Sequence, residues 1–199
     1  MTEKEDKKKL IAYGMYCNYI KEIKHFDTIQ TYFRILTSTI LLASFAAVGF
    51  LFSIPKLDIP FERSISAILV SVIGIASIFT LWHIDLKFYQ RLLMSNFAEA
   101  YRLEKENSWI PKVHRNMLFA THKKDHPSNI ANYYIGCLFS ITITIGFAIS
   151  YNLYAIQKKT IYSIVSIVVA LILMAIFCFY IKKKTFKITD FLKEIKYIE

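Results

Sequence analysis

Charged side chains are absent from four long stretches of this sequence, at residues 35–54, 64–83, 133–154 and 161–181. Enzymes and coupled transporters that work inside a bilayer generally need an ionisable residue there. If these stretches cross a membrane, their lack of charge argues against proton-coupled and ion-coupled transport. The His-Glu-x-x-His sequence of an intramembrane metalloprotease is also missing.

Glycine and cysteine are scarce, with five and three residues among 199. Few glycines leave little room for phosphate-cradling loops, and the sequence has no Walker A lysine loop, no dinucleotide-binding glycine fingerprint and no Gly-x-Ser-x-Gly turn. Cys17, Cys137 and Cys178 form no spacing pattern, and two of them lie inside apolar stretches. We therefore expect packing roles for the cysteines, with no disulfide framework, no metal site and no cofactor.

Apolar residues make up most of what is present, because 55% of the chain is hydrophobic and the mean hydropathy is +0.37. Each uncharged stretch has about twenty residues, which at about 1.5 Å per residue matches the roughly 30 Å hydrocarbon core of a bilayer. The first stretch begins after 34 residues and is too long for the apolar core of a cleaved signal peptide. The pattern predicts an all-α membrane protein with four transmembrane helices, in preference to a soluble bundle of four wholly buried helices.

Basic residues are distributed unevenly along the chain, which carries a net charge of +10. Of the 25 Lys and Arg residues, 21 lie before the first apolar stretch, between the second and the third, or after the fourth. The positive-inside rule then places both termini and the middle of the chain in the cytoplasm, with short external turns at 55–63 and 155–160. Attraction to anionic lipid accounts for the excess positive charge. Direct nucleic-acid binding is not needed to explain it and stays an open alternative.

Five segments follow from this topology. Residues 1–34 have apolar residues at helical spacing and form a cytoplasmic amphipathic helix that leads into a first transmembrane hairpin, 35–83. Residues 84–132 form a helical cytoplasmic extension and loop. A second transmembrane hairpin, 133–181, and a basic cytoplasmic tail helix, 182–199, complete the chain.

The cytoplasmic extension continues the second span as one long helix, because no proline or glycine interrupts residues 75–108. Its apolar stripe must be covered by the N-terminal helix, the tail or a neighbouring subunit. Residues 108–111 end this helix, and residues 112–120 form a short helix of their own.

Small or polar residues recur every four positions through the third span and share one slowly drifting helix face. They are Asn132, Gly136, Ser140, Thr144, Ala148 and Asn152. Such a face is a packing seam against another span, because small residues let helices approach closely, or it lines a pore in an oligomer. The fourth span, rich in Ile, Val and Leu, is expected to face lipid.

The polar middle of the chain, residues 83–132, holds four of the five histidines. His83 and Asp85 are two positions apart on a helix and do not share a face, so a relay between them is not expected. The other three histidines have no cysteine nearby and only Asp125 as an acidic companion, so no metal site is expected. They are His114, His122 and His126.

Arg115 and Asn116, followed by His122, resemble the Arg-x4-6-His motif of the higher-eukaryote and prokaryote nucleotide-binding class of ribonucleases. In such a site an imidazole moves the 2′-hydroxyl proton while a guanidinium stabilises the charge of the phosphorane. The resemblance implies a dimer, because these sites are assembled from two copies. The structural alternative is a basic loop that faces lipid phosphates.

The four spans, the cytoplasmic termini and the helical excursion after the second span resemble the small membrane proteins of bacterial antiphage systems. The similarity is to the four-span accessory proteins encoded beside type VI-B CRISPR nucleases. It implies a non-enzymatic accessory or effector in the bacterial inner membrane, acting as a homo-oligomer and able to form a pore, with an RNA-guided nuclease as partner. Two alternatives stay open: a membrane-tethered ribonuclease that uses Arg115, Asn116 and His122, and a small channel or transporter for an uncharged solute.

Overall fold

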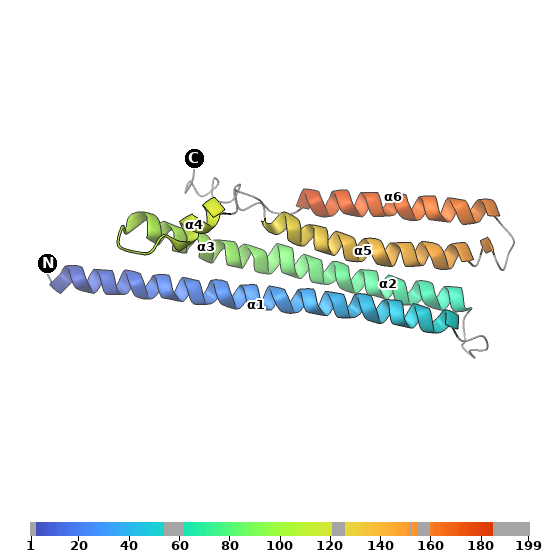
Figure 1. Cartoon of the computed structure of the whole chain (residues 1–199), viewed down its shortest axis with the longest axis horizontal. Helices are drawn as coiled ribbons and strands as arrows, with labels where there is room; N and C mark the ends of the chain where they lie inside the picture. Colours follow the sequence, from blue (N-terminus) through green and yellow to red (C-terminus); the bar gives the residue numbers. More distant parts are fainter. Residues whose placement is uncertain (1–2, 54–61, 121–125, 152, 155–159, 185–199) are drawn as a thin grey trace. The chain divides into compact units, whose positions relative to one another are not determined.

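The computed structural model describes residues 3–53, 62–120, 126–151, 153–154 and 160–184, and its elements are all helices (Figure 1). They are α1 (Glu3–Ser53), α2 (Arg63–Trp82), the π-helix η1 (His83–Tyr89), α3 (Gln90–Glu106), α4 (Val113–Ala120), α5 (His126–Tyr151) and α6 (Thr160–Lys184). Within the ranges given above there is no β-strand, which confirms the all-α prediction.

Four helical segments are long and apolar enough to cross a membrane, as predicted: Glu3–Ser53, Arg63–Glu106, Asn129–Tyr151 and Thr160–Lys183. They support the prediction of a membrane protein with four spans. The last is the least enclosed by the rest of the chain, since only 6% of its most apolar window is buried. This exposure agrees with the expectation that the fourth span faces lipid.

The chain forms two compact units. We call the first the polar unit, which contains residues up to Tyr32 and Ile84–Asn129. The second is the apolar unit, which contains Phe33–His83 and the chain from Ile130 through α6. Because α1 is a single helix, it contributes its first part to the polar unit and its second part to the apolar unit.

Burial along α1 follows a seven-residue repeat. Tyr16, Gln30, Thr37 and Ser44 are buried, and Ile23 is half-buried. Positions seven apart lie on nearly the same helix face, as in coiled coils. Three of the buried residues are polar, and the Thr37 and Ser44 hydroxyls each donate to the carbonyl four residues earlier at 2.8 Å.

The core of the polar unit lies between α1 and α3. The cluster consists of Tyr16, Ala100, Leu103 and Ile110, with Tyr19 and Ile23 packed against it. Of the three covers considered for the apolar stripe of α3, the structure shows the N-terminal helix, whereas residues 185–199 of the predicted tail helix lie outside the described residues. Tyr13 and Ile20 of that helix are 48% and 37% exposed, because the buried row runs through Tyr16.

Two glycines of the apolar unit lie beside other helices, and Gly74 is at the tighter contact. A Cβ added at Gly74 of α2 would lie 2.6 Å from Ser44 Oγ of α1 and 3.1 Å from Ile141 Cδ1 of α5. A Cβ added at Gly146 of α5 would lie 3.5 Å from the Cβ of Ala170 on α6. Small residues allow this approach between helices whose other surroundings are lipid.

Aromatic rings join α2 and α6. Phe79 and Phe177 have ring centroids 6.1 Å apart, and Trp82 and Tyr180 have centroids 6.0 Å apart. Trp82 is fully buried, and its indole Nε1 has no hydrogen-bond partner among the described residues. The indole ring therefore contributes packing without the hydrogen bond that buried tryptophans usually make.

The long helix predicted across residues 75–108 forms, and it ends at Glu106. The predicted break at 108–111 and the short helix that follows it are also present, since α4 begins at Val113. One feature differs: His83–Tyr89 has π geometry. No proline or glycine marks this segment in the sequence, so the usual signals of a helix irregularity do not predict it.

Candidate functional site

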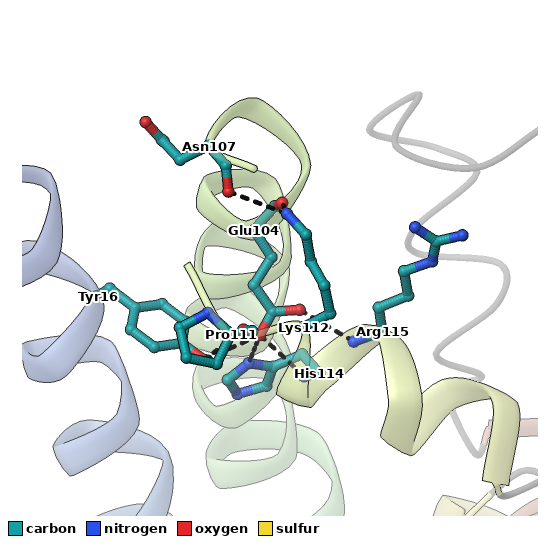
Figure 2. A network of polar contacts seen from close by, with 7 residues as sticks. All are labelled: Tyr16, Glu104, Asn107, Pro111, Lys112, His114 and Arg115. Carbon is teal, nitrogen blue, oxygen red and sulfur yellow. Dashed lines mark hydrogen bonds and ion pairs between the residues drawn. The ribbon is translucent and has the colours of Figure 1, made fainter. Parts of the chain in front are cut away.

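A group of buried polar side chains lies at the corner between α3 and α4 in the polar unit (Figure 2). Glu104, in the last turn of α3, is 1% exposed, and His114, in the first turn of α4, is 4% exposed. Tyr16 of α1, which is 3% exposed, completes the group. The site thus joins residues 88 positions apart in the sequence.

The carboxylate of Glu104 is the centre of this site. Its Oε1 accepts hydrogen bonds from the Tyr16 hydroxyl (2.9 Å) and the backbone N–H of His114 (2.9 Å), and it lies 2.8 Å from His114 Nδ1. Its Oε2 accepts a hydrogen bond from the backbone N–H of Arg115 (3.1 Å). An ionised carboxylate only accepts, so these donors satisfy a charge that would be costly to bury alone.

Two of these donors belong to the start of α4. His114 and Arg115 are its second and third residues, and backbone N–H groups in a first helical turn have no partner inside their own helix. Glu104 therefore caps α4 from a different helix. Its negative charge also complements the positive end of the helix dipole.

Lys112 makes the opposite contribution to α3. Its Nζ donates to the backbone carbonyls of Glu104 and Asn107, the second at 2.9 Å. The last carbonyls of a helix lack intrahelical donors, and a cation is favoured beside them. The corner is thus held by an exchange of caps: α3 supplies an anion to the start of α4, and the residue before α4 supplies a cation to the end of α3.

Aromatic packing encloses the polar contacts. The His114 ring packs edge-on against Phe97, with centroids 4.9 Å apart, and against Tyr16, with centroids 6.0 Å apart. The Tyr16 hydroxyl also lies 3.3 Å from the Pro111 carbonyl oxygen, so α1 contacts both α3 and the turn before α4. Exclusion of water strengthens hydrogen bonds in such a network.

The environment shifts two pKa values in opposite directions. Burial alone would raise the pKa of Glu104, but the backbone N–H groups of His114 and Arg115, then the His114 ring and Tyr16, together lower it below its ordinary value. Burial, followed by the hydrogen bond to Glu104 and its charge, raises the pKa of Tyr16 above its ordinary value. At neutral pH the carboxylate is therefore ionised and the phenol is a donor.

Arg115 and Asn116, two of the residues predicted for ribonuclease chemistry, lie in the first turns of α4 beside this site. Arg115 gives its backbone N–H to Glu104, while its side chain extends away from the carboxylate (Figure 2). Asn116 is exposed, and its backbone N–H donates to the Lys112 carbonyl (3.0 Å). His122 lies outside the described residues, so its pairing with Arg115 stays a prediction.

Of the three histidines considered as metal ligands, the structure describes the side chain of His114, whereas those of His122 and His126 lie outside the description. No group of three or more His, Cys, Asp or Glu side chains suited to a metal ion occurs among the described residues. His114 instead contacts Glu104 and Phe97. Its role is therefore to help hold the corner.

The stripe predicted on the third span lies on α5 and passes through different environments. Asn132 and Gly136 are exposed, Ser140 and Thr144 are half-buried, and Ala148 is buried. A Cβ added at Gly136 would meet nothing within 4 Å. Among the described residues, the close glycine contact is at Gly74, and the stripe's use between subunits or in a pore stays a prediction. Its last member, Asn152, lies outside the described residues.

Glu104 and Tyr16 are not among the predicted site residues. A signal for Glu104 exists, because it lies seven residues after Phe97 and so falls on the apolar face of its helix. A carboxylate on such a face, just before a helix break, needs donors from elsewhere. Tyr16 belongs to the predicted amphipathic helix, but nothing local indicates its partner 88 residues away.

No protein-family model, curated protein or solved structure matches the chain. What the site does chemically follows from its own contacts. Both carboxylate oxygens of Glu104 accept hydrogen bonds from the chain, so the buried groups fix α4 against α3 and α1. Arg115 and Asn116 lie exposed beside this arrangement.

Proposed function

We propose that this chain is a non-enzymatic integral membrane accessory or effector protein of bacterial antiphage defence of the CRISPR type, acting as a homo-oligomer. Four helices long and apolar enough to cross a membrane support the membrane part. The resemblance in topology supports the role in defence. An inner-membrane location with cytoplasmic termini, contact with anionic lipid and an RNA-guided nuclease partner belong to the same proposal.

The Glu104 site is the observation that supports a non-enzymatic role. A general acid or base must come within hydrogen-bond reach of its substrate. Glu104, His114 and Tyr16 are at most 4% exposed and are bonded to one another. These buried contacts hold the helices of the polar unit together. Such a unit suits the binding of a partner better than the turnover of a substrate.

The open face of α5 supports assembly. Asn132 and Gly136 are exposed, and the space beside Gly136 is empty to 4 Å. Transmembrane helices associate through small residues and through polar side chains that avoid lipid. A second copy of the chain would cover this face, and a ring of copies would bring such faces around a central pore.

Replacing Gly136 and Ser140 together by Leu tests the oligomer. The added side chains would block close approach, so we expect a smaller assembly in native mass analysis and loss of protection in a phage challenge. Val168→Leu, at a 48% exposed position of α6, is the control and should leave both unchanged. An unaltered assembly size in the double variant would count against the seam.

A membrane-tethered ribonuclease is the second candidate. It is favoured by the exposure of Arg115 and Asn116 on a helix that Glu104 holds in place. The Arg115→Ala/His122→Ala variant separates the two functions. Unchanged protection removes the ribonuclease, whereas loss of RNA cleavage at an unchanged assembly size would replace our proposal with it.

A further inference from the structure

The helix from Arg63 to Glu106 changes phase at η1. In α2 one row of buried residues is spaced alternately by three and four, Ser64, Ala67, Ser71, Gly74, Ile78 and Leu81, and Trp82 is buried beside it. Continued past the buried Asp85, this repeat would bury Phe88 and Leu92, but their side chains are 63% and 38% exposed. The buried row runs instead in steps of four through Trp82, Leu86, Gln90 and Met94, whereas an α-helix repeats every 3.6 residues. Since a π turn holds more residues than an α turn, η1 takes up about one residue that an α-helix would not need.

Gln30 of α1 contacts this π segment. Its Nε2 donates to the Gln90 side-chain Oε1 at 2.9 Å and to the Asp85 backbone carbonyl at 3.3 Å. Asp85 and Gln90 are five residues apart, which is the spacing of π-helical hydrogen bonds. All three residues are at most 3% exposed, so the contacts are shielded from water. Gln30 thus bridges one turn of π geometry.

We propose that η1 sets the register of α3 against α1. The hydrogen bonds of Gln30 keep the π turn and its extra residue in place, and this register brings Glu104 to Tyr16. One residue corresponds to about 100° of rotation on an α-helix. If η1 relaxed to α geometry, the face of α3 that meets α1 would move by one residue, and Glu104 would leave Tyr16. The cap on α4 would then lose its support from α1. A binding partner that favours one register would control the presentation of Arg115 and Asn116.

Hydrogen exchange of the full chain in detergent tests this proposal. In Gln30→Leu, we expect exchange to rise about tenfold in peptides covering η1 and also in peptides covering α4, because one buried hydrogen-bonded bridge is lost. Thr31→Leu, at an exposed neighbouring position of α1, is the matched control and should change neither. Faster exchange in η1 alone would overturn the proposed link to α4.

Deletion of Phe88 provides the second variant. With one exposed residue removed, the η1 segment can be α-helical while Gln90 and Glu104 still face α1. We therefore expect the deletion to leave α4 protection unchanged, and to restore it when combined with Gln30→Leu. Deletion of Lys21, an exposed residue of α1 between Tyr16 and Gln30, has no π segment to absorb it and should lose α4 protection. If deleting Phe88 abolished α4 protection, or failed to restore it in Gln30→Leu, the extra-residue interpretation would be wrong.

Discussion

Glu104→Gln removes one charge from the corner between α3 and α4 with little change in side-chain volume. The carboxylate accepts the backbone N–H of His114 on one oxygen and that of Arg115 on the other. A glutamine has a single oxygen, so its amide NH2 must face one of these donors. A hydrogen bond to a charged group contributes about 1.5–3 kcal/mol, and a buried donor left unsatisfied costs about 1–3 kcal/mol. We expect the corner to lose about 3–5 kcal/mol of local stability.

Hydrogen exchange of α4 in the intact chain measures this loss. A decrease of about 3–5 kcal/mol corresponds to α4 amides that exchange about 150 to 5,000 times faster. Glu106→Gln is the control, because Glu106 is 59% exposed and lies 3.7 Å from Arg102. Surface pairs of this kind contribute about 0–1 kcal/mol. Equal exchange of α4 in the two variants would refute the role of Glu104 as the cap.

Acid should reproduce the effect of Glu104→Gln. Since the pKa of Glu104 in the folded chain is below its ordinary value of 4.5, its contribution to stability is complete above pH 4.5 and is lost as pH falls through the folded pKa. For Tyr16 the sign is opposite, because its pKa is raised: its contribution is complete below pH 10.0 and is lost as pH rises through the folded pKa. Protection of α4 in the wild type should fall in acid, and Glu104→Gln should show a smaller fall. If α4 protection fell equally in acid in the wild type and in Glu104→Gln, Glu104 would be excluded as the source of the acid dependence.

Two further predictions concern the apolar unit. Gly74→Ala places a Cβ 2.6 Å from Ser44 Oγ, so we expect a loss of about 1–3 kcal/mol and a lower Tm in detergent; Gly49→Ala, with nothing within 4 Å, should keep the wild-type Tm. Trp82→Phe removes an indole N–H that has no partner among the described residues, so Tm should stay or rise. Trp82→Ala should lose about 3–5 kcal/mol through the cavity it opens. Similar losses in the two Trp82 variants would contradict the assignment of an unsatisfied donor.

The spans could be predicted because the length and composition of an apolar stretch decide whether a helix can cross a bilayer. The break after α3 was also predictable, since Pro111 cannot continue a helix. These features depend on residues close together in the sequence. The helices that carry the spans end at Ser53, Tyr151 and Lys184, within a few residues of the predicted ends, but α1 and α5 begin earlier than their spans and the second helix continues to Glu106.

The Glu104 site and η1 depend on contacts between distant segments. The spacing from Phe97 places Glu104 on the apolar face of α3, but the donors that satisfy its carboxylate come from α1 and the start of α4. The π geometry of η1 follows from matching the buried row of α3 to Gln30 on α1. The spacing of residues within one helix predicts neither the pair Tyr16 and Glu104 nor the pair Gln30 and Gln90.

The 88-residue separation of Tyr16 and Glu104 has a consequence for the order of biosynthesis. A ribosome adds about 5–20 residues per second, so about 4–18 s pass between the synthesis of these two residues. During that interval the α1 residues of the polar core have no partner, and α2 is made before α3. The first hairpin is thus available to the membrane insertion machinery before the polar unit has all of its parts, and a chain stalled ahead of Glu104 would carry an uncovered Tyr16 face for chaperones to bind.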